Sequence, residues 1–522
     1  MPRLLEQRLR RMLASGNVKL LGGGRKGLEK ESLRIATAGG IAQTPHPHAW
    51  GAPLTHPYIT TDYSEALAEF ITPAFEDAAQ TVAFLTDVHR YAYQHLADDE
   101  VMWAASMPCA VSDDGAIPIA NYGSSNIGQM KHIYRVGLDY RYGRRMQAIA
   151  GVHFNYSLPT AFWPGYRADE ASTDELRTFV DDAYFSLIRN FKRLGWMVPL
   201  LFGNSPAVCK SFLAGRTTRF QELTPGTFYL PHATSLRVSD IGYKNKNQTD
   251  LRVSYDNLDD YVESLNRALV TPYPEYEAIG LRDGDRLIQL STNMLQIENE
   301  YYSFVRPKRT AAAGERPSTA LRARGAEYVE VRALDVNCLS PVGIEVEQLY
   351  FLEAFLIFCL LEESPLLTDD ELRAIEYNEL TVALRGRAPG LELIENGQRR
   401  SIKSWSLEIC ERMRAICEYL DLGNEEQPYA RALDAQIDAL RHPETLPSAR
   451  VLQTLADTGQ EFHRFALQLS TDYAASFRAE SIATEVSRTF DNHATASHAE
   501  QARLESSDTI PLEQYIADYI AG

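Results

Sequence analysis

The sequence predicts an α+β fold, with an antiparallel sheet in the first two-thirds of the chain and helices in the last third. Three observations support this. Separate segments between residues 27 and 334 alternate apolar and polar residues, as strands with one buried face do. Helical spacing then dominates residues 345–480. No internal repeat or linker-like stretch divides the chain. We therefore expect a single domain over residues 1–522, with its sheet mainly in 20–345 and a helical part in 345–522.

The first predicted strand is Gly27-Leu28-Glu29-Lys30-Glu31-Ser32-Leu33-Arg34. Residues two apart share one face of a strand, so Glu29 and Glu31 stand side by side. Two carboxylates this close repel each other unless one is protonated or a cation lies between them. An exposed edge strand with its acids in water explains an isolated pair equally well. The pair indicates a functional site only if further acidic residues lie beside it in the fold.

The segment from Ile59 to Pro73 supplies further acids, Asp62, Glu65 and Glu69. Its second half is rich in β-forming residues and stops at a proline, which predicts a strand with Glu69 on one face. A helix that places all three acids on one side is the alternative. Either geometry gathers carboxylates.

Two later segments, residues 151–159 and 327–334, repeat the alternation of a strand with one apolar face. The polar residues that they contribute are His153, Asn155, Ser157, Glu330 and Arg332. A third alternating run covers residues 295–302. The Gly, Pro and Arg content of residues 311–324 predicts a mobile loop. Helices are expected over residues 2–14, 76–98, 131–150, 173–194, 345–362, 368–383, 403–420, 427–441, 449–456 and 458–480.

Composition and charge exclude several classes of protein. The hydrophobic fraction of 45% and the charged fraction of 23% are typical of a soluble globular chain. A net charge of −18 argues against nonspecific binding to nucleic acid or to an anionic membrane. No apolar run reaches the length of a membrane span, and the basic N-terminus lacks the apolar stretch of a secretory signal. The six cysteines form no Cys-x-x-Cys pair, so we expect reduced, mostly buried thiols in a cytoplasmic protein.

The polar faces of the predicted strands have an unusual composition. A wetted face usually carries Thr, Lys and mixed charges, and an ordinary amphipathic sheet is the simpler interpretation. Here the faces carry Glu29, Glu31, Glu69, His153 and Glu330, with Asp62 beside them. Carboxylates that converge on a concave surface repel one another, and hard divalent cations relieve that repulsion. Mg²⁺ is the usual ion where phosphate completes the coordination. The sequence therefore leaves two interpretations open, a site for a metal ion and a nucleotide, and an ordinary amphipathic sheet with one solvated face.

Several of these segments match a known family in order. The chain closely resembles the proteobacterial glutamate–cysteine ligases in residues 27–34, 60–65, 69–73, 151–157 and 327–332, and residues 233–237, 297–302 and 306–309 add to the match. The likeness runs from about residue 20 to 345 and is weak in the helical C-terminal third. It implies a glutamine-synthetase-like carboxylate–amine ligase fold, in which an antiparallel sheet curves into a funnel with helices outside.

The resemblance also implies a reaction. ATP would phosphorylate the γ-carboxylate of L-glutamate, and the amino group of L-cysteine would displace phosphate from the resulting acyl phosphate. This is the first step of glutathione synthesis. ATP, glutamate and cysteine are then the partners, glutathione is a feedback inhibitor, and the chain is a monomer without a nucleic-acid or membrane partner. A ligase of the same fold that uses another amine, and a nucleotide or amino-acid sensor without turnover, are the alternatives.

The same resemblance assigns roles to individual residues. The ligands of Mg²⁺, or of Mn²⁺, would be Glu29, Glu31, Asp62, Glu69, His153 and Glu330. Glu330 and Arg332 would be catalytic, and Asn155 and Arg332 would contact the nucleotide. The pocket for cysteine would be formed by Tyr63, Tyr134, Gln147, Arg237, Tyr243 and Tyr302. Tyr63 stands where relatives often have phenylalanine.

Overall fold

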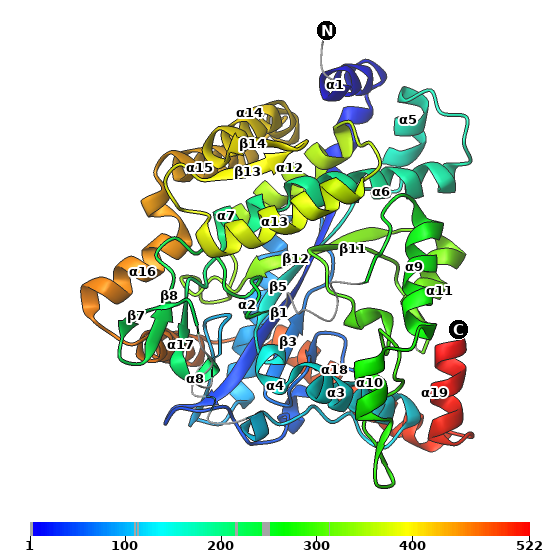
Figure 1. Cartoon of the computed structure of the whole chain (residues 1–522), viewed down its shortest axis with the longest axis vertical. Helices are drawn as coiled ribbons and strands as arrows, with labels where there is room; N and C mark the ends of the chain where they lie inside the picture. The colour runs from blue at the N-terminus through cyan, green and yellow to red at the C-terminus, as the bar shows by residue number, and fades with distance from the viewer. Residues whose placement is uncertain (1–3, 109–110, 112–113, 214–217, 243–250, 313) are drawn as a thin grey trace.

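The structure is a computed structural model that describes residues 4–108, 111, 114–213, 218–242, 251–312 and 314–522. An antiparallel sheet of seven strands lies at its centre, in the order β11-β12-β5-β1-β3-β2, with β4 paired to the end of β1 (Figure 1). The strands are β1 (Arg25–Ala36), β2 (Ile59–Thr61), β3 (Leu67–Ile71), β4 (Glu100–Met102), β5 (Gly151–Ser157), β11 (Val305–Lys308) and β12 (Tyr328–Asp335). The sheet is open and does not close into a barrel.

Strand β1 is the spine of this sheet, because it pairs with β3, β4 and β5. Its register sets Glu29 opposite His153 on β5 and Glu31 opposite Glu69 on β3. The alternation predicted for residues 27–34 is thus confirmed. The strand interpretation of the segment after Ile59 is confirmed as well, and the helical alternative is wrong.

Helices cover the apolar face of the sheet. Helix α2 (Ala78–His95) packs on β1, α6 (Leu176–Leu194) on β11, and α7 (Met197–Phe202) on β12. Behind them lies α12 (Val346–Leu361), which is apolar around nearly its whole circumference and packs against α6 and α15. A helix without a polar face is stable only when it is buried. Each of its fully buried Leu or Phe side chains contributes about 1.5–3 kcal/mol.

The other helices complete an α+β molecule, so the expected fold class is confirmed. They are α1 (Leu4–Ser15), α3 (Asn126–Tyr142), α4 (Arg144–Gln147), α5 (Phe162–Asp169), α8 (Lys210–Leu213), α9 (Leu258–Val270), α10 (Pro274–Ile279), α11 (Pro317–Arg324), α13 (Asp369–Arg385), α14 (Ile402–Leu420), α15 (Pro428–Arg441), α16 (Pro447–Thr458), α17 (Phe462–Ala479), α18 (Thr484–Ser507) and α19 (Leu512–Ala521). Small sheets join β6 (Ala207–Cys209), β7 (Gln221–Thr224) and β8 (Thr227–Tyr229), β9 (Arg282–Asp283) and β10 (Arg286–Leu287), and β13 (Glu392–Glu395) and β14 (Gln398–Ser401).

Three predicted elements differ in the structure. Residues 295–302 form no strand but contain a 3₁₀ turn, η5 (Glu298–Glu300), because ion pairs hold its two glutamates. Residues 317–324 are helical, with a proline in the first turn, where its missing N–H costs nothing. The helix predicted over 131–150 begins earlier and is interrupted at Gly143, whose φ of +80° favours glycine.

A buried ion pair ties the helical third to the sheet. Lys26 on β1 donates to Glu353 on α12 over 2.7 Å, and both side chains are almost fully buried. Tyr429 on α15 donates to the same carboxylate oxygen over 2.6 Å. Each charge therefore has its partner inside the protein, and removing one would leave the other buried and unpaired.

The cysteines are free and buried at positions 338, 359, 410 and 417, as expected. Cys209 is disulfide-bonded, so the expectation of a reduced thiol is wrong at that position. Cys109 lies outside the described residues. Among the helices of the described chain, none combines the length and hydrophobicity that a membrane crossing requires.

Two buried histidines make the stability of the fold pH-dependent. Burial, with Arg34 nearby, lowers the pKa of His46 to about 3, and burial, with His493 nearby, lowers the pKa of His56 to about 4. An unfolded histidine has a pKa near 6.5. The unfolded chain therefore binds more protons between these values, and stability falls as the pH drops below about 6.5.

A His46→Phe variant should lose less of this stability. The His46 ring meets Trp50 edge-on at 5.4 Å between centroids and neither of its nitrogens is hydrogen-bonded, so phenylalanine can replace it. Between pH 7.5 and pH 5, the free energy of unfolding of the variant should fall by about 2 kcal/mol less than that of wild type. Urea unfolding at both values measures this, with the exposed His442→Phe as control. Equal changes in wild type and the His46 variant would contradict the assignment.

Candidate active site

The polar face of the sheet brings acids and a histidine from three strands together. His153 Nδ1 lies 3.0 Å from Glu29 Oε2 and 3.6 Å from Glu330 Oε1. Asn155 Nδ2 donates to the other oxygen of Glu29 over 2.9 Å. The antiparallel register produces these contacts, because Glu29 pairs with His153 and Glu330 pairs with Asn155. The cluster lies where β1, β5 and β12 run side by side.

One group in this cluster has the geometry of a metal site. Each of Glu29, Glu69 and His153 offers a ligand atom within 4.8 Å of the other two. Burial raises the pKa of Glu69 well above its usual value, and the charges of Glu29 and Asp62 raise it further. Burial also lowers the pKa of His153, with Arg332 adding to the effect, so the imidazole is held neutral. Crowded carboxylates beside a neutral imidazole are a donor set that divalent cations fit.

Glu31 extends the acidic face away from this group. Its Oε2 accepts the Gly151 N–H over 2.6 Å, and its Oε1 lies 3.7 Å from His153 Nε2. Burial and the neighbouring charge of Asp62 raise the pKa of Glu31 to about 8. A cation bound between these acids would remove the repulsion that raises it.

Glu330 has the opposite electrostatic environment. Its side chain is 1% exposed. Burial opposes its ionisation, but Lys308 and Arg332 outweigh burial and hold the pKa of Glu330 well below its usual range. Arg332 Nη1 lies 3.0 Å from Glu330 Oε1, and Lys308 Nζ lies 3.4 Å from Oε2. Glu330 therefore lies at the junction of the acidic and basic parts of the face, where the neighbouring cations favour its ionised form.

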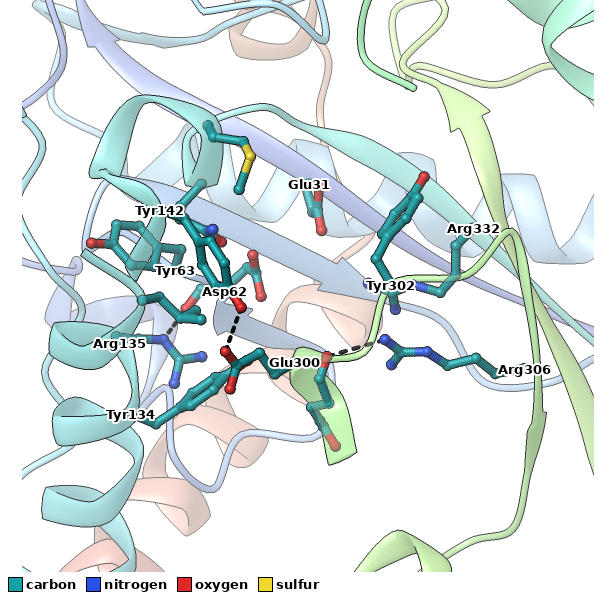
Figure 2. Close-up of a pocket in the computed structure, with 14 residues that line it drawn as sticks. Glu31, Asp62, Tyr63, Tyr134, Arg135, Tyr142, Glu300, Tyr302, Arg306 and Arg332 are labelled. Atoms are coloured by element: carbon teal, nitrogen blue, oxygen red, sulfur yellow. Dashed lines mark hydrogen bonds between the residues drawn. The ribbon is translucent and has the colours of Figure 1, made fainter. Parts of the chain in front are cut away.

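A cavity opens at the Glu31 end of the polar face (Figure 2). Tyr134 and Arg135 of α3 stand on one side of it, and Tyr302, Arg306 and Arg332 stand on the other. Its lining comprises Glu31, Asp62, Tyr63, Tyr134, Arg135, Leu138, Tyr142, Met146, Gln147, Asn299, Glu300, Tyr302, Arg306 and Arg332. We call it the α3 cavity. Both charge signs face it, which suits a small zwitterionic molecule.

A second hollow lies at the opposite end of the same strands. Arg25 of β1 and Ser157 of β5, which pair with each other, contribute to its lining. Trp163, Val180 and Tyr184 give it an apolar side, and Arg309 contributes positive charge. The cluster around His153 thus lies on the strands between two hollows.

Two buried arginines fix the turn η5 at the rim of the α3 cavity. Arg141 Nη1 lies 2.9 Å from Glu300 Oε1, with both side chains at most 1% exposed, and Tyr142 donates to the same oxygen over 2.7 Å. Arg316 Nε donates to Glu298 over 2.9 Å. The two acids of one short turn are held by different elements, so the turn is locked against α3 and α11.

Comparison with known proteins identifies a family whose members are similar to this chain over most of its length. The model of the glutamate–cysteine ligase family matches residues 9–382. The glutamate–cysteine ligase of Azotobacter vinelandii is 48% identical over 524 aligned residues, covering 100% of this chain and 99% of its own. The enzyme of that name from Alcanivorax borkumensis is 46% identical, with 99% of each chain covered.

The chain belongs to the glutamate–cysteine ligase family.

A solved structure agrees with the sequence comparison. The glutamate–cysteine ligase of Francisella tularensis in complex with AMP superposes with a TM-score of 0.90 at 33% identity, covering 96% of this chain and 98% of the other. The relatives match the helical C-terminal third as well, where the sequence motifs are weak.

The structure places most of the expected ligase residues on one surface. Those in the cluster are Glu29, Glu69, His153, Asn155 and Glu330, and those that line the α3 cavity are Glu31, Asp62, Tyr63, Tyr134, Gln147, Tyr302 and Arg332. Arg237 is not part of that lining. It is 1% exposed and donates to the carbonyl oxygen of Arg332 over 3.0 Å. Tyr243 lies outside the described residues.

Sequence reasoning missed part of the cavity wall of this ligase. Arg135, Tyr142, Asn299, Glu300 and Arg306 line the cavity without belonging to any predicted site. Arg135 follows the expected Tyr134 directly, and Arg306 begins the segment 306–309, which shares the family resemblance. Helical and strand spacing alone could not show which of these side chains turn inward.

The Arg141–Glu300 pair provides a stability test of the cavity wall. An Arg141→Met variant leaves Glu300 buried without its cation, which should lower the free energy of unfolding by about 3–5 kcal/mol. The double variant R141M/E300Q should recover part of that loss, because no unpaired charge remains. Urea unfolding measures both. The exposed pair of Arg267 and Glu263 provides the control R267M, with an expected change within about 0.5 kcal/mol. A loss no larger than that of the control would contradict the clamp.

Proposed function

We propose that this chain catalyses the ATP-dependent joining of the γ-carboxylate of L-glutamate to the amino group of L-cysteine. The γ-phosphoryl group of ATP passes to the glutamate carboxylate, which releases ADP. The cysteine amine then attacks the carbonyl carbon of the acyl phosphate. The C–N bond forms, the C–O bond breaks with its electron pair on the departing phosphate, and the nitrogen loses a proton. The observation that carries the proposal is the cluster of Glu29, Glu69 and His153 between two hollows, in a chain of this ligase family.

The donor set fits divalent cations. Glu29, Glu69 and His153 would hold one ion, and Glu31, Asp62 and Glu330 are placed to join further ions. The crowding that raises the pKa of Glu69 and Glu31 is the physical reason for binding there. Mg²⁺ or Mn²⁺, when bound, supplies charge neutralisation for the phosphates and the substrate carboxylate.

The chain's own residues position and neutralise the reacting groups. Arg332 is held by Glu330 at 3.0 Å and stands at the border of the cluster and the α3 cavity. We assign it to the transferring phosphoryl group, whose charge spreads over oxygens that a planar guanidinium can bind in pairs. We assign Asn155 to the nucleotide, because it lies on β5 two residues before Ser157, which lines the second hollow.

The two hollows suit different substrates. The α3 cavity, with Tyr63, Tyr134, Gln147 and Tyr302, would take the amino acids. The second hollow, with the apolar Trp163 and the cationic Arg309, would take the nucleotide. Phosphoryl transfer would then occur between them, over the acidic cluster. We also propose feedback inhibition by glutathione, a cytoplasmic location, and a monomer that acts as a single domain.

A coupled assay of ADP release tests the proposed reaction. With glutamate and ATP present, ADP release should depend on added L-cysteine, and γ-glutamylcysteine should accumulate in equal amount. Dependence on ammonia instead would favour a same-fold ligase with another amine. Binding of ATP without any ADP release would favour a sensor, and either result would overturn the proposal.

Glu330 should be essential to turnover but not to the fold. A Glu330→Gln variant keeps the shape and loses the charge, so the rate of ADP release should fall by at least about a hundredfold. Thermal unfolding and circular dichroism check that the variant is folded. The exposed Glu347→Gln provides the matched control with an unchanged rate. A near-normal rate in E330Q would remove Glu330 from the site.

A further inference from the structure

Arg306 is a buried cation in the α3 cavity to which no role has been assigned. It lies on β11 opposite Glu330 of β12, so its side chain leaves the sheet on the polar face. Only 7% of the residue is exposed, and it contributes to the lining of the cavity. Figure 2 shows its guanidinium group directed toward the turn that carries Asn299 and Glu300.

The guanidinium group of Arg306 is poorly satisfied. Its Nη2 donates to the carbonyl oxygen of Asn299 over 3.0 Å, and its Nε has no hydrogen-bond partner. Among the described residues, no carboxylate lies within 4.0 Å of it, because Glu330 is engaged by Arg332 and Lys308. A guanidinium group has five N–H donors, so most of its capacity is unused.

Two arginines around the same turn are more fully paired than Arg306. Arg141 donates to Gln289, Glu300 and Ser291, and Arg316 donates to Glu298, Asn266 and the carbonyl oxygen of Ile520. Both lie around the same turn, and both have a carboxylate partner. A buried cation without a partner is unfavourable for stability, and a bound anion would remove that cost.

The cavity indicates which anion this would be. Glu31 and Asp62 line it together with Arg306, so it presents negative charge as well as this cation. In Figure 2 the two acids lie apart from the guanidinium group of Arg306, across the cavity. An amino acid carries an ammonium group and a carboxylate two bonds apart. The acids suit the first group, and Arg306 suits the second, in a charge-assisted hydrogen bond.

We propose that Arg306 binds the α-carboxylate of an amino-acid substrate in the α3 cavity. The inference rests on the proposed function and adds to it the group that recognises the carboxylate. It differs from the expectation for Arg237, which supports the strand of Arg332 and does not line the cavity. Glutamate and cysteine both carry an α-carboxylate, and the experiment below decides which of the two Arg306 binds.

The test compares each substrate with its analogue that lacks the α-carboxylate. Cysteamine replaces cysteine in one series, and 4-aminobutyrate replaces glutamate in the other. Wild type should prefer the carboxylate-bearing substrate strongly in kcat/KM. In Arg306→Met that preference should shrink by roughly ten- to a hundredfold in one series, because a hydrogen bond to a charged group is lost. The series in which it shrinks identifies the amino acid. Preferences unchanged in both series would overturn the proposal.

A second measurement distinguishes ligand binding from a merely structural role. If Arg306 awaits a ligand, R306M should unfold at the same temperature as ligand-free wild type or at a higher one. Arg189 provides the matched control, because it is 6% exposed, lies on α6 outside both hollows, and donates to the carbonyl oxygens of Tyr255 and Asp256. R189M should unfold at a lower temperature and keep the wild-type preference between substrates. A loss of stability in R306M as large as that in R189M would overturn the proposal.

The outcomes also separate this inference from the proposed function. If wild type forms no γ-glutamylcysteine, the proposed function fails, and the preference for α-carboxylates cannot be attributed to it. If wild type is active and R306M keeps its full preference, only the role of Arg306 fails. A partial return of the preference in Arg306→Lys would agree with charge recognition by a group that lacks the planar fork.

Discussion

The repulsion among carboxylates on one sheet face is the constraint on which the rest of this structure depends. Backbone pairing forces Glu29 toward His153 and Glu31 toward Glu69, whatever the side chains prefer. Among the described residues, the ion pairs of Arg332 and Lys308 lie on the β12 side of this surface, at Glu330. Burial and mutual repulsion still raise the pKa of Glu31 and Glu69. The sheet register thus brings the proposed cation ligands Glu29, Glu69 and His153 together.

The surroundings of this face divide into groups that are satisfied and groups that are not. Lys26, Arg141 and Arg316 each have a carboxylate partner inside the protein, and these pairs hold elements together. Among the described residues, the guanidinium group of Arg306 has no carboxylate partner, and the Oδ1 atom of Asn155 accepts no hydrogen bond. Fully paired buried charges maintain the shape, whereas partly paired ones point to ligands. Buried polar groups around this face are therefore of two kinds, those that hold the fold together and those that are available to a ligand.

The fold and the polar cluster could be predicted from sequence because their pattern is local. A period of two marks β1, β5 and β12, and it places Glu29, His153 and Glu330 on one face. The turn at Glu298–Glu300 could not be predicted this way, since its alternation resembles a strand and its partners are up to 159 residues away. The orientation of the Arg306 side chain depends on Arg332 and Lys308, which already pair with Glu330. The spacing of residues in the sequence does not show such pairing.

The Lys26–Glu353–Tyr429 contact has a consequence for any shortened form of the chain. It joins the first strand to helices more than 300 residues later, so the strand that carries Glu29 is completed only by the last third of the protein. A fragment that stops after β12 would contain every acid of the cluster but would lack the carboxylate that pairs with the Lys26 ammonium group in the full chain. During synthesis, this ion pair between the first strand and the helical third can form only after α12 has been made.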